Sequence, residues 1–394
     1  MFIRYRSVLS VPGAPRLFGS ALVARLPQGM ASLAILLLVR GATGSYPAAG
    51  AAVGAYALAS AVTAPLQGAL VDRFGRVRVL APTAFAQGIV LIALVVASRA
   101  GGHAVALVAL SGLAGGLYPP IAPTVRALLR ERLEDPTVRE TAYALESIAQ
   151  ELVWITGPLL VGLVITVISP AAAVLLLGVV CMGGTVLFVR SPLAAGRGSR
   201  PRAHRRAAAL GSAQLRALLA PIALTGVGLG AVEVGLPSLA LHAGSRSASG
   251  LMLALWSAGS LTGGLWYGSR SWSSPLGARY RLLLLTLVGC TAPLIAARSV
   301  PAGLALSLVA GLAIAPMFSC QYALVGRAAT AGSETEAFTW VTAALVGGLA
   351  AGSAAGGAVA AQGVSAPFLL SCAATTLAAA LATVVAGRRP ARVA

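Results

Sequence analysis

The chain has 394 residues, of which 58% are hydrophobic and only 10% are charged. Soluble domains carry about 25% charged residues, so this composition excludes a water-soluble globular fold and indicates that most side chains face lipid or other helices. The formal net charge of +19 raises the question of nucleic-acid binding. However, the arginines recur between apolar runs instead of forming a patch interleaved with aromatic residues, and we expect no nucleic-acid partner.

Apolar runs dominate the chain, and each is long enough to cross a bilayer, which takes about 20 residues. They lack the period-2 alternation of barrel strands, so they are predicted to be helices, which pair their backbone groups internally. Twelve spans are expected, at 16–39, 48–70, 79–98, 104–125, 141–168, 171–189, 216–240, 249–268, 281–298, 302–325, 337–360 and 365–386. The sequence therefore predicts an all-α membrane protein.

The distribution of arginines predicts the orientation. With the N-terminus inside, the inner segments carry nearly all of the arginines, and the outer loops carry only Arg40, Arg99, Arg246 and Arg298. Positive residues favour the cytoplasmic side, and an even number of spans returns the chain to it. We expect both termini in the cytoplasm and a bacterial cytoplasmic membrane. No small-residue cleavage site follows the first span, which we expect to be retained.

A basic, glycine-containing turn joins the second and third spans. It reads Gly68-Ala-Leu-Val-Asp72-Arg73-Phe-Gly75-Arg76, and the spacing G-x-x-x-D-R-x-G-R resembles the signature loop of major facilitator superfamily (MFS) transporters. The resemblance implies two six-helix lobes around a midplane site. It also implies that Asp72 latches the cytoplasmic ends of the lobes, at a helix end and through paired arginines. An ordinary positive-inside turn is the alternative interpretation.

Two ionisable residues lie deep within predicted spans of the first half, Arg25 in span 1 and Glu151 in span 5. An ionisable group at such depth is costly in lipid, so each should face a cavity or a partner. We hypothesise that Arg25 and Glu151 pair in the cavity, with Gln28 and Gln150 nearby. The pair could bind substrate or exchange a proton, or it could be a fixed structural ion pair.

Span 5 also carries the sequence Gly157-Pro158-Leu-Leu-Val-Gly162. This part resembles the span-5 motif of MFS antiporters, although the upstream glycines and the Gly-Gly pair after the proline are missing. The resemblance implies a gating role for Gly157 and Pro158. The alternative is a packing kink, because proline bends a membrane helix and small neighbours let another helix approach.

An arginine-rich stretch divides the spans six and six. We therefore expect an N-terminal lobe at 1–190, a cytoplasmic basic linker at 191–215 and a C-terminal lobe at 216–394. The halves look related, because Gly264-Leu-Trp-Tyr-Gly268-Ser269 ends span 8 as Gly68 to Arg73 ends span 2. Gly268 stands where the first copy has Asp72.

Three further glutamates fall near or within spans. Glu233, in span 7, has no obvious partner and is either a proton carrier or a structural residue. Glu146 is expected to be solvated or paired with Arg139 or Arg126. Ser333-x-x-Glu336 reads as a capping box at the start of span 11.

In the MFS family spans 1, 4, 7 and 10 line the cavity, with 2, 5, 8 and 11 beside them. The resemblance therefore implies contacts of aromatic, amide and thioether side chains with a substrate, although each is also compatible with core packing. These residues are Met30, Tyr118, Trp154, Trp256, Gln321, Tyr322 and Trp340. A partly apolar cavity suits a hydrophobic or amphipathic substrate. Gly112, Gly116, Gly348, Gly352 and Gly356 are assigned to helix packing.

Cysteine and histidine usage predicts neither a metal nor a cofactor. The four cysteines lie inside apolar runs without C-x-x-C spacing, and the three histidines are scattered over loops. No nucleotide-binding loop or hydrolase motif appears. A membrane-embedded enzyme or sensor is thus a remote alternative.

The sequence therefore predicts a secondary transporter that works by alternating access. Export by proton antiport is favoured, with Glu151 or Glu233 as the carrier and a small, partly hydrophobic molecule as the substrate. The alternative is a proton-coupled importer or a uniporter of a sugar, amino acid or other metabolite. We expect a monomer.

Overall fold

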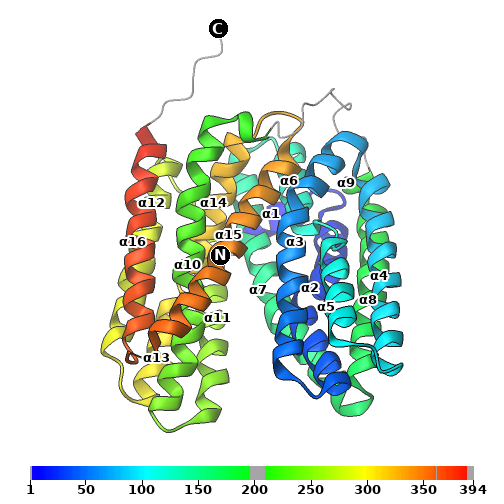
Figure 1. Cartoon of the computed structure of the whole chain (residues 1–394). Helices are drawn as coiled ribbons and strands as arrows, with labels where there is room; N and C mark the ends of the chain where they lie inside the picture. The colour runs from blue at the N-terminus through cyan, green and yellow to red at the C-terminus, as the bar shows by residue number, and fades with distance from the viewer. Residues whose placement is uncertain (1, 196–208, 361, 388–394) are drawn as a thin grey trace.

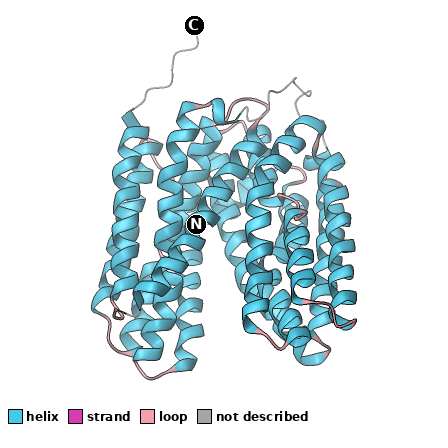
Figure 2. Cartoon of the chain, viewed as in Figure 1, coloured by secondary structure: helices cyan, strands magenta, loops and turns pink. Residues whose placement is uncertain are grey.

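The computed structural model describes residues 2–195, 209–360 and 362–387, and this part of the chain is helical with no strand (Figure 2). The helices form two lobes that lie side by side (Figure 1). The all-α prediction is confirmed.

The first lobe contains a short amphipathic helix, α1, followed by the helices of the first six spans. Their bounds are α1 Phe2–Leu9, α2 Ala14–Thr43, α3 Tyr46–Phe74, α4 Arg76–Arg99, α5 Ala104–Gly116, α6 Ile121–Arg132, α7 Pro136–Val167 and α8 Pro170–Val189. The fourth span is divided into α5 and α6 around Pro119 and Pro120, because proline lacks the N–H that continues a helix.

The second lobe repeats this plan. Its bounds are α10 Ala213–His242, α11 Arg246–Gly268, α12 Leu276–Thr291, η2 Ala292–Ala296, α13 Val300–Gly311, α14 Ile314–Ala328, α15 Glu334–Ala360 and α16 Ala366–Gly387. A 3₁₀ turn, η2, ends the ninth span at Pro293, and the tenth span is divided into α13 and α14.

The twelve expected spans each fall on one of these helices or helix pairs. Ten helical segments of the described residues are long and apolar enough to cross a membrane, and Ala366–Ala382 is a shorter apolar helix. Together with α11 they account for the predicted number. The fifth span begins at Pro136 instead of 141, since Asp135 accepts a hydrogen bond from the backbone N–H of Thr137 and caps the helix there.

The predicted linker at 191–215 is partly helical. It contains α9 (Pro192–Ala195) and η1 (Ala209–Gly211), and α10 already begins at Ala213. The rest of this predicted segment, and the final residues of the predicted C-terminal lobe, lie outside the described residues.

Glycines set the distance between helices within the second lobe. A Cβ on Gly352 of α15 would lie 2.0 Å from the carbonyl oxygen of Val227 on α10, and one on Gly348 would lie 2.0 Å from that of Ala223. Only hydrogen fits at such contacts, so the predicted packing role of the α15 glycines is confirmed.

Among the described residues, the lobes share a hydrophobic core at one end. We call this end the terminal face, which carries the turns at 74–76, 132–136 and 268–276, and the opposite end the distal face. The largest core cluster draws on both lobes, for example Tyr143 and Phe338, and lies toward the terminal face. Two smaller clusters lie toward the distal face, and each stays within one lobe. The lobe ribbons accordingly diverge toward the distal face (Figure 1).

Candidate functional site

A buried ionic cluster lies at the lobe junction. Arg25 Nη1 of α2 donates to Glu146 Oε1 of α7 at 2.6 Å, and both side chains are fully buried. Arg126 Nε of α6 lies 3.5 Å from the same oxygen. The predicted pair of Arg25 with Glu151 is therefore wrong, and so is the solvated Glu146. Of the two arginines predicted for Glu146, Arg126 is the partner.

The cluster reaches across to the second lobe through an aromatic ring. The guanidinium carbon of Arg126 lies 3.9 Å from the ring centroid of Tyr322 on α14, a favourable cation–π geometry. Tyr322 in turn packs edge-to-face against Tyr143 of the first lobe and Phe338 of the second. The contact of Arg126 with Tyr322 was not predicted, because the place of Arg126 in the broken fourth span is not visible in the hydropathy pattern.

Glu151 makes a separate contact between the lobes. Its Oε1 accepts a hydrogen bond of 2.8 Å from the hydroxyl of Ser260 on α11. Gln150 Nε2 donates to Gln28 Oε1 at 3.4 Å, so these two amides contact each other, but the Arg25–Glu151 pair that they were predicted to flank does not form. Glu151 lies near the middle of α7. Its partner Ser260 was not predicted, because no sequence motif distinguishes it.

Two arginines of the cluster face one carboxylate. Arg25 and Arg126 supply two positive charges, and Glu146, the acid that contacts both, supplies one negative charge. Arg25 Nη2 and Glu146 Oε2 are buried without a hydrogen-bond partner among the described residues. An unmatched charge in such surroundings is expensive, so the ionised Glu146 is needed to hold both guanidiniums.

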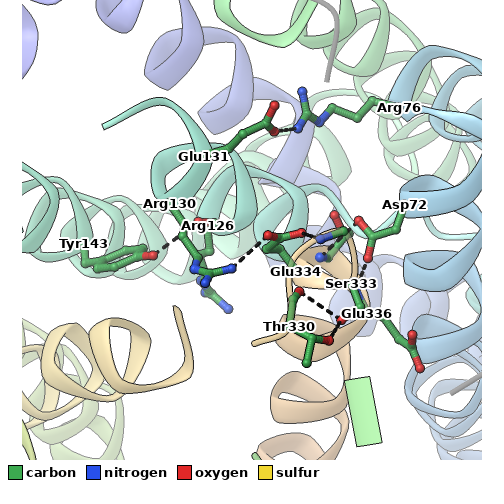
Figure 3. Close-up of polar contacts among 12 residues, drawn as sticks. Asp72, Arg76, Arg126, Arg130, Glu131, Tyr143, Thr330, Ser333, Glu334 and Glu336 are labelled. Carbon is green, nitrogen blue, oxygen red and sulfur yellow. Dashed lines mark hydrogen bonds and ion pairs between the residues drawn. The ribbon is translucent and has the colours of Figure 1, made fainter. Parts of the chain in front are cut away.

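Asp72 contacts the other lobe at the terminal face (Figure 3). Its Oδ1 accepts from the backbone N–H of Thr335 at 3.2 Å, and its Oδ2 accepts from that of Glu336 at 2.9 Å. The carboxylate therefore caps the N-terminus of α15, where the helix dipole favours negative charge. The predicted contact at a helix end is confirmed, and the predicted capping box is wrong, because Asp72 takes the N–H group that Ser333 would have capped.

The arginines around Asp72 bind elsewhere. Arg130 Nη1 of α6 donates to Glu334 Oε1 across the lobes at 2.8 Å, and Arg76 pairs with Glu131 inside the first lobe (Figure 3). Arg73 is exposed, and its guanidinium lies over the ring of Phe74. The prediction that the arginines of the turn pair with Asp72 is wrong, since backbone N–H groups hold the carboxylate.

The two glycines of the turn have distinct structural uses. Gly75 has a φ of +89°, a conformation that side chains disfavour, and it separates α3 from α4 within one residue. A Cβ on Gly68 would lie 2.5 Å from Thr339 Oγ1 of α15, so this glycine lets α3 and α15 approach.

Replacing Asp72 by Asn is expected to open the terminal face. Asn keeps one acceptor oxygen but loses the charge that interacts with the α15 dipole, which costs about 1 kcal/mol. The ratio of open to closed conformers should rise about fivefold. Spin labels on cysteines that replace the exposed Arg78 and Arg327, with the native cysteines changed to alanine, would report the distance. An unchanged distance distribution would show that the cap does not hold the lobes together.

The other predicted site residues are dispersed. Glu233 is exposed on α10 with no ion pair or hydrogen bond found among the described residues, and Met30 is fully buried in the distal core of the first lobe. Trp154 is 48% exposed on α7. Gln321 is fully buried, and its Oε1 accepts a hydrogen bond from Tyr280 Oη at 3.2 Å.

Two of the predicted tryptophans line the shared core. Trp256 of α11 and Trp340 of α15 pack against it, and the indole Nε1 of Trp340 is buried without a partner among the described residues. Gly157 of α7 meets Gly29 of α2, since a Cβ on Gly157 would lie 2.5 Å from the Gly29 carbonyl carbon. This contact lies within the first lobe, and it fits the packing interpretation of the Gly157-Pro158 sequence.

Two repeated bundles of membrane-spanning helices, joined at one face by a helix cap and ion pairs, define the class of multi-pass membrane transporters. The family model described as Major Facilitator Superfamily matches residues 17–271. The chain belongs to this family, whose members are transporters and not enzymes. The resemblance seen in the turn at 68–76 is thereby confirmed.

A curated relative supports the assignment. The uncharacterized MFS-type transporter y4rN of Sinorhizobium fredii (strain NBRC 101917 / NGR234) is 28% identical over 189 residues. This match covers 47% of the chain and 45% of the relative, so it spans less than half of that protein's length.

Solved structures share the fold. A bacterial homologue of the iron transporter ferroportin, in its outward-facing state, aligns with a TM-score of 0.78 at 17% identity, over 95% of this chain and 99% of that chain. The human organic anion transporter MFSD10 (TETRAN) aligns with a TM-score of 0.74 at 18% identity, over 93% and 99% of the two chains. Both similarities concern the fold alone.

Proposed function

We propose that the protein exports a small, partly hydrophobic molecule in exchange for protons by alternating access. The observation that carries this proposal is the position of Glu151. It is an ionisable residue near the middle of a membrane-spanning helix, hydrogen-bonded to Ser260 of the opposite lobe. Rocking of the lobes breaks or forms this contact, and it thereby links the protonation of a carboxylate to the side that is open.

Competition for one carboxylate is the basis of antiport in this proposal. Glu151 accepts a hydrogen bond from Ser260, and a substrate that binds the ionised carboxylate competes with the proton for it. Glu233 is the second candidate for the carrier, on the basis of its place in α10.

The terminal face is proposed to be cytoplasmic. It carries the arginine-rich turns and the described ends of the linker, α9 and η1, as the positive-inside rule requires. The Asp72 cap and the Arg130–Glu334 ion pair join the lobes there, which supports an outward-facing conformer, and we propose a bacterial cytoplasmic membrane as its location. Both termini are then cytoplasmic, and the protein works as a monomer in this proposal.

Replacing Glu151 by Gln is expected to abolish gradient-driven transport and to leave folding intact. Gln retains an acceptor for Ser260 but cannot exchange a proton. A thermal-shift screen over antibiotics and metabolites would provide a ligand, and its flux in proteoliposomes would be measured after a pH jump. The matched variant combines Glu151→Gln with Gln150→Glu, which moves the carboxylate by one residue, about 100° around α7 and away from Ser260, and the flux should stay lost. If Glu151→Gln transports as fast as the wild type, Glu151 does not carry the proton. If the flux through the wild-type protein does not depend on the pH gradient, the protein is a uniporter.

A further inference from the structure

The short helix α1 lies across the lobe junction at the terminal face. Tyr5 is 7% exposed, and its hydroxyl donates to the carbonyl oxygens of Gly264 and Leu265 on α11, each at 3.1 Å. Arg4 Nη1 donates to the carbonyl oxygen of Arg270 at 2.5 Å. Val8 of the same helix is buried in the core that both lobes share. A segment joined to the first lobe is therefore bonded to the second.

The contact is shaped around a glycine. A Cβ on Gly268 would lie 2.3 Å from the Tyr5 hydroxyl and 2.6 Å from the Cβ of Ala144 on α7. A side chain at position 268 would displace Tyr5. Burial raises the pKa of Tyr5 to about 12, so the hydroxyl keeps its proton and remains a donor at neutral pH.

This site is the counterpart, in the second lobe, of the Asp72 cap. Gly68 and Asp72 end α3 and contact the start of α15, whereas Gly264 and Gly268 end α11 and contact α7. The second lobe has no acidic side chain at the corresponding position, because Gly268 replaces it. Tyr5 occupies that place and supplies a polar contact between the lobes.

We propose that α1 is a second latch on the terminal face and that Tyr5 is its gating residue. The hydroxyl bonds to α11 hold the face closed at the junction of α7 with α11, as Asp72 holds it at the junction of α3 with α15. Both latches must release before the terminal face opens. The inference rests on the alternating access of the proposed function, and on neither the substrate nor proton coupling.

Distance measurements on the full-length protein test this latch. Spin labels on cysteines that replace the exposed Arg78 of α4 and Arg281 of α12, in a chain with its native cysteines changed to alanine, report opening of the terminal face. Tyr5→Phe keeps the ring but removes the donor, so the ratio of open to closed conformers should rise about fivefold, the equivalent of one net hydrogen bond. Tyr5→Ala removes the packing as well and should raise it at least about tenfold.

The matched control is Arg6→Ala, on the exposed side of α1, which should leave the distance distribution unchanged. If only Tyr5→Ala shifts the distance distribution, α1 is still a latch, and the packing of the Tyr5 ring holds it in place of the hydroxyl hydrogen bonds. No shift with either Tyr5 variant would overturn the proposal. Because the readout needs no substrate and no pH gradient, its result is independent of whether Glu151 carries a proton.

Discussion

Replacing Glu146 by Gln is expected to destabilise the protein by about 3–5 kcal/mol, the usual cost of removing one partner of a buried ion pair. Glu146 is fully buried, and its Oε1 faces both Arg25 and Arg126. The neutral amide leaves both guanidiniums without a compensating charge. The readout is the unfolding free energy in detergent, with the yield of monodisperse protein as a second measure.

Glu131→Gln is the matched control for this prediction. Glu131 pairs with Arg76 at the terminal face, and its side chain is 22% exposed, so its loss should cost about 1 kcal/mol or less. Equal losses in the two variants would contradict the assignment of Glu146 as the charge that holds the cluster together.

The partner of Arg25 could not be found from sequence depth alone. Glu146 and Glu151 lie on the same helix, and five residues at 100° each place them about 140° apart around its axis. The rotation of α7 about its axis is determined by its crossing with α2 at Gly29 and Gly157. The sequence alone does not show where two helices cross. It turns Glu146 toward Arg25 inside the first lobe and Glu151 toward Ser260 of the second.

The spans and the contact of Asp72 with the other lobe could be predicted because their sequence signals are local. Lipid requires long apolar helices, and the turn at 68–76 has a recognisable spacing. The capping rule at Ser333 failed for a related reason, since it considers only neighbours in the chain, and the acceptor comes from the other lobe. Tyr5 carried no signal at all, because α1 is short and its partners are backbone carbonyls about 260 residues away.

Gly157→Ala is expected to cost about 1–3 kcal/mol of stability, toward the upper end of the range for overpacking. The added Cβ would lie 2.5 Å from the Gly29 carbonyl carbon and 2.6 Å from its Cα. These are backbone atoms, which cannot move aside by changing a rotamer, so α2 and α7 must separate. Gly162→Ala, on the same helix with nothing within 4 Å of the added Cβ, should be neutral or stabilising by up to about 1 kcal/mol.

Measuring both stability and flux distinguishes the two interpretations of the Gly157-Pro158 sequence. If Gly157 only packs α2 against α7, Gly157→Ala lowers the melting temperature while the flux per folded molecule stays close to that of the wild type. If the glycine is a gate, the flux falls at unchanged stability. The first outcome is expected, because the close approach joins two helices of one lobe and crosses no surface that must open when the lobes rock.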